Sequence, residues 1–236
     1  MPISGPYENR VLSSLPQYVQ KRLRPHLREV LVAKDDYLFQ QDEAVKCVYF
    51  PETAVVSEYQ ILEDGRTIEV AIVGNEGALG VTSAFSSCRA INCSQVCVGG
   101  KVLKINSDYL ERELSADQSL QYALHQTILR QMKQLSQKVI CNTFHSVEQR
   151  FCTWLLMLHD RFGGDCLRIT HEHIARVLGV HRPSITCIAQ GLRDKGLIDY
   201  SRGRVVIRDL AGLEENACIC YGESDAMTLH LSGHIH

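Results

Sequence analysis

The chain has 236 residues, of which 45% are hydrophobic, and its formal net charge at pH 7 is −2. This hydrophobic fraction supports one large or two small globular domains and excludes an intrinsically disordered chain. The near-neutral charge excludes a polycation, so any nucleic-acid binding must come from a local basic patch. No run approaches the roughly 18 to 20 apolar residues of a membrane helix, and the N-terminus lacks a secretory signal pattern. We therefore expect a cytoplasmic protein with no membrane partner.

The N-terminal part of the chain is expected to be mainly β. Short helices over residues 8–27, broken at Pro16 and ending near Pro25, precede short β-rich runs separated by charged turns over residues 28–106. Such runs predict a small antiparallel barrel or sandwich, and "EDGR" at 63–66 indicates a hairpin. The expected strands are REVLVA (28–33), YLFQ (37–40), KCVYF (46–50), AVVSEYQIL (54–62), TIEVAIV (67–73), ALGVTSA (78–84), RAINCSQVCV (89–98) and KVLKI (101–105).

From residue 107 onward the hydrophobic period is helical. Residues 115–141 contain neither Gly nor Pro, which predicts a helix about 40 Å long. Its narrow apolar seam can pack on its own domain or on a twin helix, and we favour the twin, in a homodimer. A second, more apolar helix is expected over 146–161, ended by Gly163 and Gly164, and a frayed polar tail over 222–236 with His230, His234 and His236. The seam residues are Leu120, Leu124, Ile128, Met132, Leu135 and Val139.

Ten cysteines are scattered along the chain without a CxxC pair, which argues against a zinc ribbon. In a cytoplasmic protein we expect free thiols, most of them small buried hydrophobes. Redox or metal sensing is the alternative, but we expect no metal site. The closest groups are Cys88, Cys93 and Cys97, and the pair Cys218 and Cys220; the others are Cys47, Cys141, Cys152, Cys166 and Cys187.

The stretch "THEHIARVLGVHRPSITCIAQGLRDKGL", residues 170–197, contains three histidines and a cysteine. A zinc-protease helix needs His-Glu-x-x-His, but Ala175 stands where the second ligand belongs, and His171 and His173 point about 200° apart. The chain also has no GxSxG elbow and no phosphate-binding loop, so no catalytic constellation supports an enzyme.

The same stretch is typical of a helix-turn-helix. Thr170 is a good N-cap, Gly179 can end the first helix, and Pro183 suits the first turn of the second. An ordinary helical hairpin with a solvated face is the alternative. The second helix has a buried face of Ile185, Ile188, Ala189 and Leu192, and a polar outer face of Arg182, Pro183, Thr186, Cys187 and Gln190, with Arg193 on its flank.

The residues that follow predict a wing, a hairpin beside the second helix. "GLIDYSRGRVVIRD" consists of two strands around a basic turn, whose Arg202 and Arg204 can reach phosphate. From Arg168 to Arg208 there are eight basic and three acidic residues, a net +5 in a chain of total charge −2.

This order of parts resembles the Crp/Fnr superfamily of bacterial transcription regulators, most specifically in "SVEQRFCTWLLMLHD" and residues 169–209. The resemblance implies a homodimer joined along the long helix, reading a two-fold operator of double-stranded DNA. By position it implies base contacts from Arg182, Pro183 and Cys187, and phosphate contacts from His181, Ser184 and Thr186. Pro183 and Cys187 differ from the charged residues of well-known members, so a different operator sequence is expected.

The sensor half departs further from the family. Cyclic-AMP-binding members carry Gly-Glu-x-x-Gly and then Arg-Ser/Thr-Ala, whereas this chain has "GNEGALG" and "CRAIN". Glu76 and Arg89 are candidate effector ligands, but the hydroxyl residue after the arginine is missing, so the phosphate-binding motif for a cyclic nucleotide is incomplete. The absence of cysteines before Cys47 argues against the N-terminal iron–sulfur cluster of Fnr-type members.

The expected fold is α+β, with a jelly-roll-like antiparallel β-roll, a long dimerisation helix and a winged helix-turn-helix. The expected domains are 8–106 (sensor), 107–143 (dimerisation helix), 144–215 (DNA-binding) and 216–236 (tail). The leading hypothesis is a sequence-specific transcription regulator tuned by an effector, with RNA polymerase as a partner if it activates. The alternative is a small-molecule or redox sensor that acts through protein partners.

Overall fold

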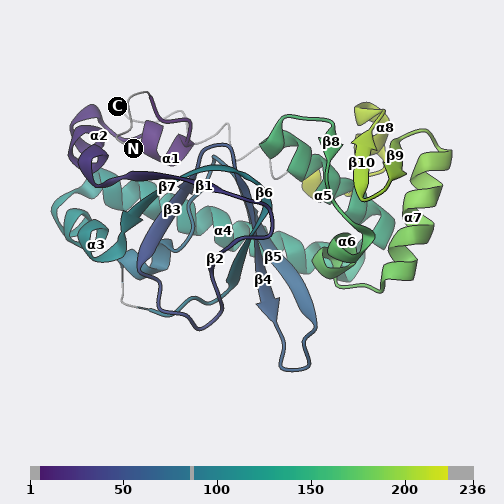
Figure 1. The fold of residues 1–236 in the computed structure, drawn as a ribbon, viewed down its shortest axis with the longest axis horizontal. Helices are drawn as coiled ribbons and strands as arrows, with labels where there is room; N and C mark the ends of the chain where they lie inside the picture. Colours follow the sequence, from purple (N-terminus) through teal and green to yellow (C-terminus); the bar gives the residue numbers. More distant parts are fainter. Residues whose placement is uncertain (1–5, 86–87, 223–236) are drawn as a thin grey trace. The chain divides into compact units, whose positions relative to one another are not determined.

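The computed structural model describes residues 6–85 and 88–222, and the chain forms two compact units (Figure 1). The first unit contains the chain up to Ile61 and Val70–Lys133, and the second contains Leu62–Glu69 and the chain from Gln134 onward. The tail expected over 222–236 lies almost wholly outside the described residues. In the part of the chain that is described, no helix is both long enough and apolar enough to cross a bilayer.

The first unit begins with three short helices, α1 (Arg10–Ser13), α2 (Gln17–Leu23) and the 3-10 helix η1 (Arg24–His26). The Asn9 side chain caps α1 by accepting the N–H groups of Val11 and Leu12. Pro16 stands at the N-cap of α2 and separates it from α1, so the predicted break is confirmed. The buried apolar residues of both helices join the core beneath them.

Two antiparallel sheets follow, in the strand orders β1-β7-β3 and β2-β6-β4-β5. They confirm the predicted antiparallel β-roll. The buried apolar residues of the two sheets form two core clusters, and Val32 and Tyr49 of the first sheet pack against the cluster of the second. The strands are β1 (Arg28–Val32), β2 (Tyr37–Phe39), β3 (Cys47–Pro51), β4 (Val55–Ile61), β5 (Thr67–Val73), β6 (Cys93–Val98) and β7 (Gly100–Asn106).

One predicted strand is wrong. The run at 78–84 contains only an isolated bridge from Leu79 to Tyr49 and then the 3-10 helix η2 (Val81–Ala84). Gly80 causes the change, because its left-handed φ of 73° turns the chain out of the extended conformation.

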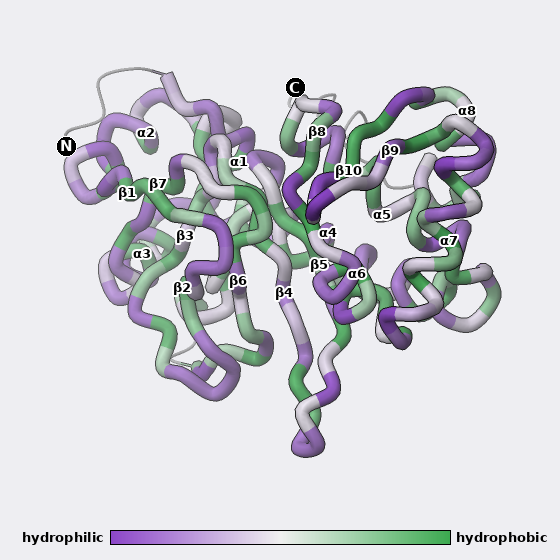
Figure 2. Tube along the Cα trace, turned by 45° about the vertical axis from the view of Figure 1, so that its right-hand side comes forward, coloured by the Kyte–Doolittle hydropathy of each residue, from purple (hydrophilic) through white to green (hydrophobic). Residues whose placement is uncertain are grey.

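The hairpin predicted at "EDGR" joins β4 to β5. The Leu62 N–H donates to the Arg66 carbonyl across 2.9 Å, and Gly65 takes a φ of 82° at the tip. Figure 2 shows that the end of this hairpin is hydrophilic.

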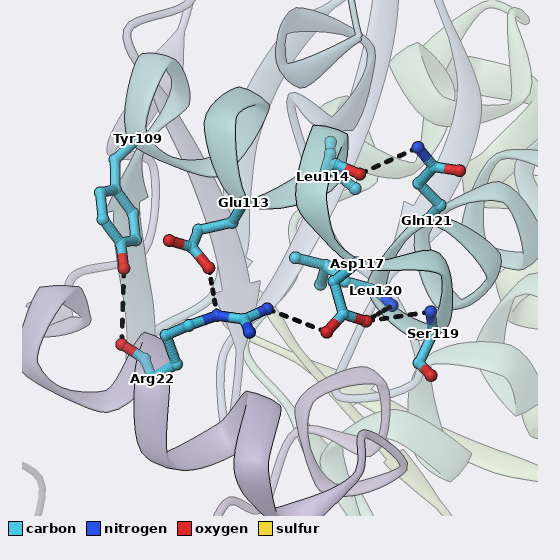
Figure 3. A network of polar contacts seen from close by, with 8 residues as sticks. All are labelled: Arg22, Tyr109, Glu113, Leu114, Asp117, Ser119, Leu120 and Gln121. Carbon is cyan, nitrogen blue, oxygen red and sulfur yellow. Dashed lines mark hydrogen bonds and ion pairs between the residues drawn. The ribbon is translucent and has the colours of Figure 1, made fainter.

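A polar network divides the helix predicted at 115–141 from the one before it (Figure 3). Helix α3 (Ser107–Ala116) ends at Asp117, whose extended backbone breaks the helix, and α4 runs over Gln118–Phe144. The Asp117 carboxylate accepts the N–H groups of Ser119 and Leu120 at 3.0 and 3.1 Å and pairs with Arg22 at 2.9 Å. Arg22 also pairs with Glu113, so α2 is tied to both ends of this junction.

The apolar seam of α4 is only partly exposed. Leu120 and Leu124 are fully buried in the first unit's core and Ile128 packs against it. Met132, Leu135 and Val139 are exposed, and so are Leu129 and Ile140 beside them. The N-terminal half of the seam therefore packs on its own unit, and only the C-terminal half presents an apolar surface.

The second unit contains α5 (Val147–Phe162), β8 (Cys166–Leu167), α6 (His171–Leu178), α7 (Arg182–Asp194), β9 (Ile198–Ser201), β10 (Arg204–Ile207) and α8 (Leu210–Glu215). A capping box between Ser146 and Gln149 starts α5, and Gly163 ends it with a left-handed φ of 71°, as predicted. Trp154 is buried in this unit, and its indole N–H donates to the Glu69 carboxylate at 3.3 Å.

Candidate nucleic-acid interface and sensor site

Helices α6 and α7 form the predicted pair. The Thr170 hydroxyl accepts the His173 N–H and starts α6, while Gly179 ends it with a φ of 65°. The left-handed cap turns the chain sharply, and Val180 N–H bonds back to the Ala175 carbonyl at 3.0 Å. Helix α7 then begins at Arg182 with Pro183 in its first turn.

Helix α7 is strongly amphipathic. Ile185, Ala189 and Leu192 are buried, and Ile188 is half-buried. All the residues predicted to contact DNA from this helix are exposed. They begin at the N-cap of the helix and continue along its solvent-facing side. They are His181, Arg182, Pro183, Ser184, Thr186, Cys187 and Gln190, and we call them the reading face.

A histidine at the start of α6 contacts the reading face. The His171 ring stacks on Tyr200 of β9 at 3.8 Å between centroids, and its Nδ1 lies 3.1 Å from the Thr186 hydroxyl of α7. Burial, and then the neighbouring Arg182 guanidinium, lower the pKa of His171, which favours its neutral form. In the sequence His171 stands out only as a possible metal ligand, because its contact with Thr186, fifteen residues away in the chain, leaves no local signal.

The wing is a tight two-residue hairpin. Strands β9 and β10 pair antiparallel, and the turn residues Arg202 and Gly203 both have positive φ, at 48° and 73°. Positive φ at both positions matches the right-handed twist of a hairpin. Arg202 and Arg204 are exposed at the tip, whereas Arg208 is paired with Asp199 at 2.6 Å. The two predicted wing arginines therefore project their charge into solvent.

The two predicted effector residues contact backbone groups in separate turns of the first unit. The Glu76 carboxylate accepts the Gly74 N–H at 3.2 Å, within its own turn. The exposed Arg89 donates to the Asp42 carbonyl at 2.6 Å. Each side chain thus stabilises a loop of the β-roll, and no described contact brings the two together at one site.

Two domain families match the chain, the cyclic nucleotide-binding domain over residues 29–117 and the Crp-like helix-turn-helix domain over residues 149–216. The chain belongs to the Crp/Fnr superfamily of transcriptional regulators. The resemblance found in the sequence is thereby confirmed, and this family is one of regulators rather than enzymes.

Similar proteins match most of this Crp/Fnr chain at low sequence identity. The "Anaerobic regulatory protein" of Bacillus subtilis is 21% identical over 183 residues, 74% of this chain and 77% of that protein. The "Global nitrogen regulator" of Synechocystis is 20% identical over 217 residues, 88% of this chain and 96% of that protein. The structure of FixK2 from Bradyrhizobium japonicum superimposes with a TM-score of 0.70 at 18% identity, covering 81% and 98% of the two chains.

The cysteines of the β-roll do not form one group in this Crp/Fnr protein. Cys93 and Cys97 are buried in β6, and the Cys97 thiol donates to the Val55 carbonyl at 3.2 Å. Cys88 lies before that strand, with its sulfur 3.6 Å from the Thr82 hydroxyl. Their arrangement supports the expectation of small buried hydrophobes for Cys93 and Cys97.

The β-roll also buries a carboxyl group on β4. Glu58 is only 8% exposed and accepts a hydrogen bond from the Ser94 hydroxyl at 3.3 Å. Burial raises the pKa of Glu58 from 4.5 to about 7, against the hydrogen bonds from Ser94 and Asn92. Between these two pH values the folded state binds a proton that the unfolded state has lost, so this group's contribution to stability falls as pH rises from 4.5 through 7.

We therefore expect Glu58→Gln to flatten this part of the pH dependence. At pH 4 the variant and the parent should have similar free energies of unfolding. At pH 8 the variant should be more stable by on the order of 2–3 kcal/mol, because it avoids burying a charge. Urea unfolding at both pH values measures this difference, and an equal effect at the two pH values would contradict the assigned titration.

Proposed function

We propose that this protein is a dimeric, sequence-specific transcription regulator in which α7 of each subunit enters a major groove of a two-fold operator. The observation that carries this proposal is the exposed reading face of α7. The left-handed turn at Gly179 and Pro183 in the first turn of α7 position this face, and the wing adds the exposed Arg202 and Arg204. The local net charge of +5 over residues 168–208 supplies the attraction to phosphate that a chain of net −2 otherwise lacks.

The reading face combines side chains suited to two kinds of contact. Arg182 carries a planar fork that matches O6 and N7 of guanine, and we propose it as the main base contact. Pro183 and Cys187 are apolar or weakly polar and suit contact with base edges such as a thymine methyl group. His181, Ser184 and Thr186 are proposed to bond phosphates, and Gln190, which donates to Asp194 at 2.7 Å, is a further candidate base contact.

The exposed part of the α4 seam supports the dimer. Leu129, Met132, Val139 and Ile140 are between 44% and 66% exposed, and they recur at spacings of three, seven and one along the helix. Solvated apolar side chains in such a stripe favour pairing with a second copy of α4. In this arrangement the two reading faces would meet half-sites about one DNA turn apart.

An effector bound by the β-roll is proposed to shift the population between conformations that bind DNA strongly and weakly. A cyclic nucleotide is one candidate, since the cyclic nucleotide-binding domain family matches residues 29–117. Measuring operator affinity with and without cyclic AMP or cyclic GMP, under reducing and oxidising conditions, tests this regulation. Unchanged affinity in every condition would remove the tuning from the proposal, and salt-insensitive interaction without operator preference would favour a sensor that acts through protein partners.

The wing supplies a test of the phosphate contacts. Arg204→Ala should weaken binding by a similar factor on every duplex and lower the slope of log K against log salt by about one, because one phosphate contact is lost. Fluorescence anisotropy with operator and unrelated duplexes over a salt series measures both quantities. Arg208→Ala, which removes an arginine already paired with Asp199, is the matched control. A loss confined to the operator would instead mean that the wing contacts bases.

A further inference from the structure

Four metal-binding side chains meet inside the second unit. Cys141 and His145 lie at the end of α4, and Cys218 and Cys220 follow α8. One sulfur or nitrogen atom from each residue lies within 4.8 Å of all the others. The three cysteines are buried and His145 is half-buried, so these groups face one another rather than solvent.

The distances match the edges of a tetrahedron around one metal ion. The sulfurs of Cys141 and Cys218 are 3.7 Å apart, and the Cys220 sulfur is 3.7 Å from Nδ1 of His145. A tetrahedral zinc site requires about 3.8 Å between two sulfurs and about 3.5 Å between a sulfur and a nitrogen, given its usual bond lengths. A polynuclear iron–sulfur cluster contains several metal atoms and holds the thiolates of different iron atoms farther apart, whereas here all four ligand atoms lie within 4.8 Å of one another.

Hydrogen bonds of the backbone position each of the two ligand pairs, Cys141 with His145 and Cys218 with Cys220. The His145 N–H donates to the Cys141 carbonyl at 3.2 Å, so these two residues are one helical turn apart on one side of the chain. The Cys218 N–H donates to the Thr153 hydroxyl at 3.0 Å, which fixes the segment after α8 against α5. The two pairs are 73 or more residues apart in sequence, so only the folded unit assembles the group.

One of the four side chains has a polar partner outside the group. The Thr153 hydroxyl oxygen lies 3.0 Å from the Cys218 sulfur, as an outer-shell partner of a metal thiolate would. Thiolate is the form that binds a metal ion.

We propose that Cys141, His145, Cys218 and Cys220 bind one zinc-type divalent ion in a closed three-sulfur, one-nitrogen site. The ion joins the last turn of α4 to the segment after α8 and contributes to the folding free energy of the second unit. This assignment differs from the sequence-based expectation of no metal site. It does not depend on DNA binding.

Metal content of the full-length protein tests the proposal. Protein purified without chelator should hold about one zinc ion per chain by elemental mass spectrometry, and cobalt substitution should give the visible absorption of a tetrahedral thiolate site. Cys218→Ser should lose both signals. Cys166→Ser, which changes an exposed cysteine outside the site, should keep them. Thr153→Val should retain the site but weaken its metal affinity by about 10- to 100-fold.

A second measurement on the unaltered protein guards against a variant that fails to fold. Alkylation of the native chain, read by peptide mass spectrometry, should leave Cys141, Cys218 and Cys220 protected until a chelator is added, while Cys166 reacts from the start. The proposal is overturned if the folded chain takes up no zinc, if a chelator changes neither alkylation nor melting temperature, or if a disulfide joins Cys141 to Cys218. Several iron atoms with acid-labile sulfide would overturn it in favour of a cluster.

Discussion

Replacing Met132 and Val139 together by aspartate should convert the regulator to a monomer and abolish tight operator binding. Both side chains are exposed in the isolated chain, at 58% and 66%, so the variant should fold normally. In the proposed dimer each carboxylate would be buried against an apolar partner helix, at a cost on the order of 3 kcal/mol or about a hundredfold in dissociation constant. Sedimentation equilibrium measures the association directly.

Operator binding should follow the association state. A monomer contacts one half-site only, so its affinity for a full operator should approach that of non-specific DNA, a loss of about three orders of magnitude or more. The control Met132→Leu with Val139→Ile keeps an apolar stripe and should remain dimeric. A parent protein that is monomeric at micromolar concentration, or an aspartate variant that still dimerises, would contradict the role given to α4.

Arg182→Ala should weaken binding to the preferred operator by about 1–3 kcal/mol and relax the sequence requirement at one base pair. The guanidinium is exposed at the start of α7, where a recognition helix first meets base edges. Alanine removes both donors of the fork, so guanine and the other bases at that position should be bound almost equally.

Two variants separate base contact from general charge. Arg182→Lys keeps the positive charge but loses the bidentate fork, and it should resemble alanine in specificity while losing less affinity. Arg112→Ala removes an exposed arginine from the first unit and should leave the binding profile unchanged. Binding across a panel of operators with single base-pair changes gives the result, and an unaltered profile for Arg182→Ala would remove this residue from base reading.

The winged helix-turn-helix could be predicted closely because its signals are local. Thr170, Gly179 and Pro183 each set the backbone within one turn of their own position, and the structure confirms all three. The wing turn has the same character, since the conformations of Arg202 and Gly203 depend on the turn itself. Local steric and capping preferences were therefore sufficient to predict these turns and helix ends.

Features set by distant contacts were harder to predict. The helical periodicity predicts one continuous apolar seam on α4, but Leu120 and Leu124 are buried in the core of the first unit. The periodicity of the helix carries no information about that core. Helix α4 also starts later than predicted, because Asp117 is held extended while it pairs with Arg22, 95 residues away. The cluster of Cys141, His145, Cys218 and Cys220 has the same origin, since neither pair alone has the spacing of a zinc motif.

Selection of duplexes from a random pool tests the central claim most directly. Purified full-length protein is equilibrated with the pool at about 150 mM salt, a concentration that suppresses non-specific binding, and the retained fragments are sequenced. We expect enrichment of an inverted repeat whose half-sites are centred about one helical turn apart, as two reading faces on a dimer require. Retained fragments without a shared sequence, with or without cyclic nucleotides and reductant, would contradict a sequence-specific regulator.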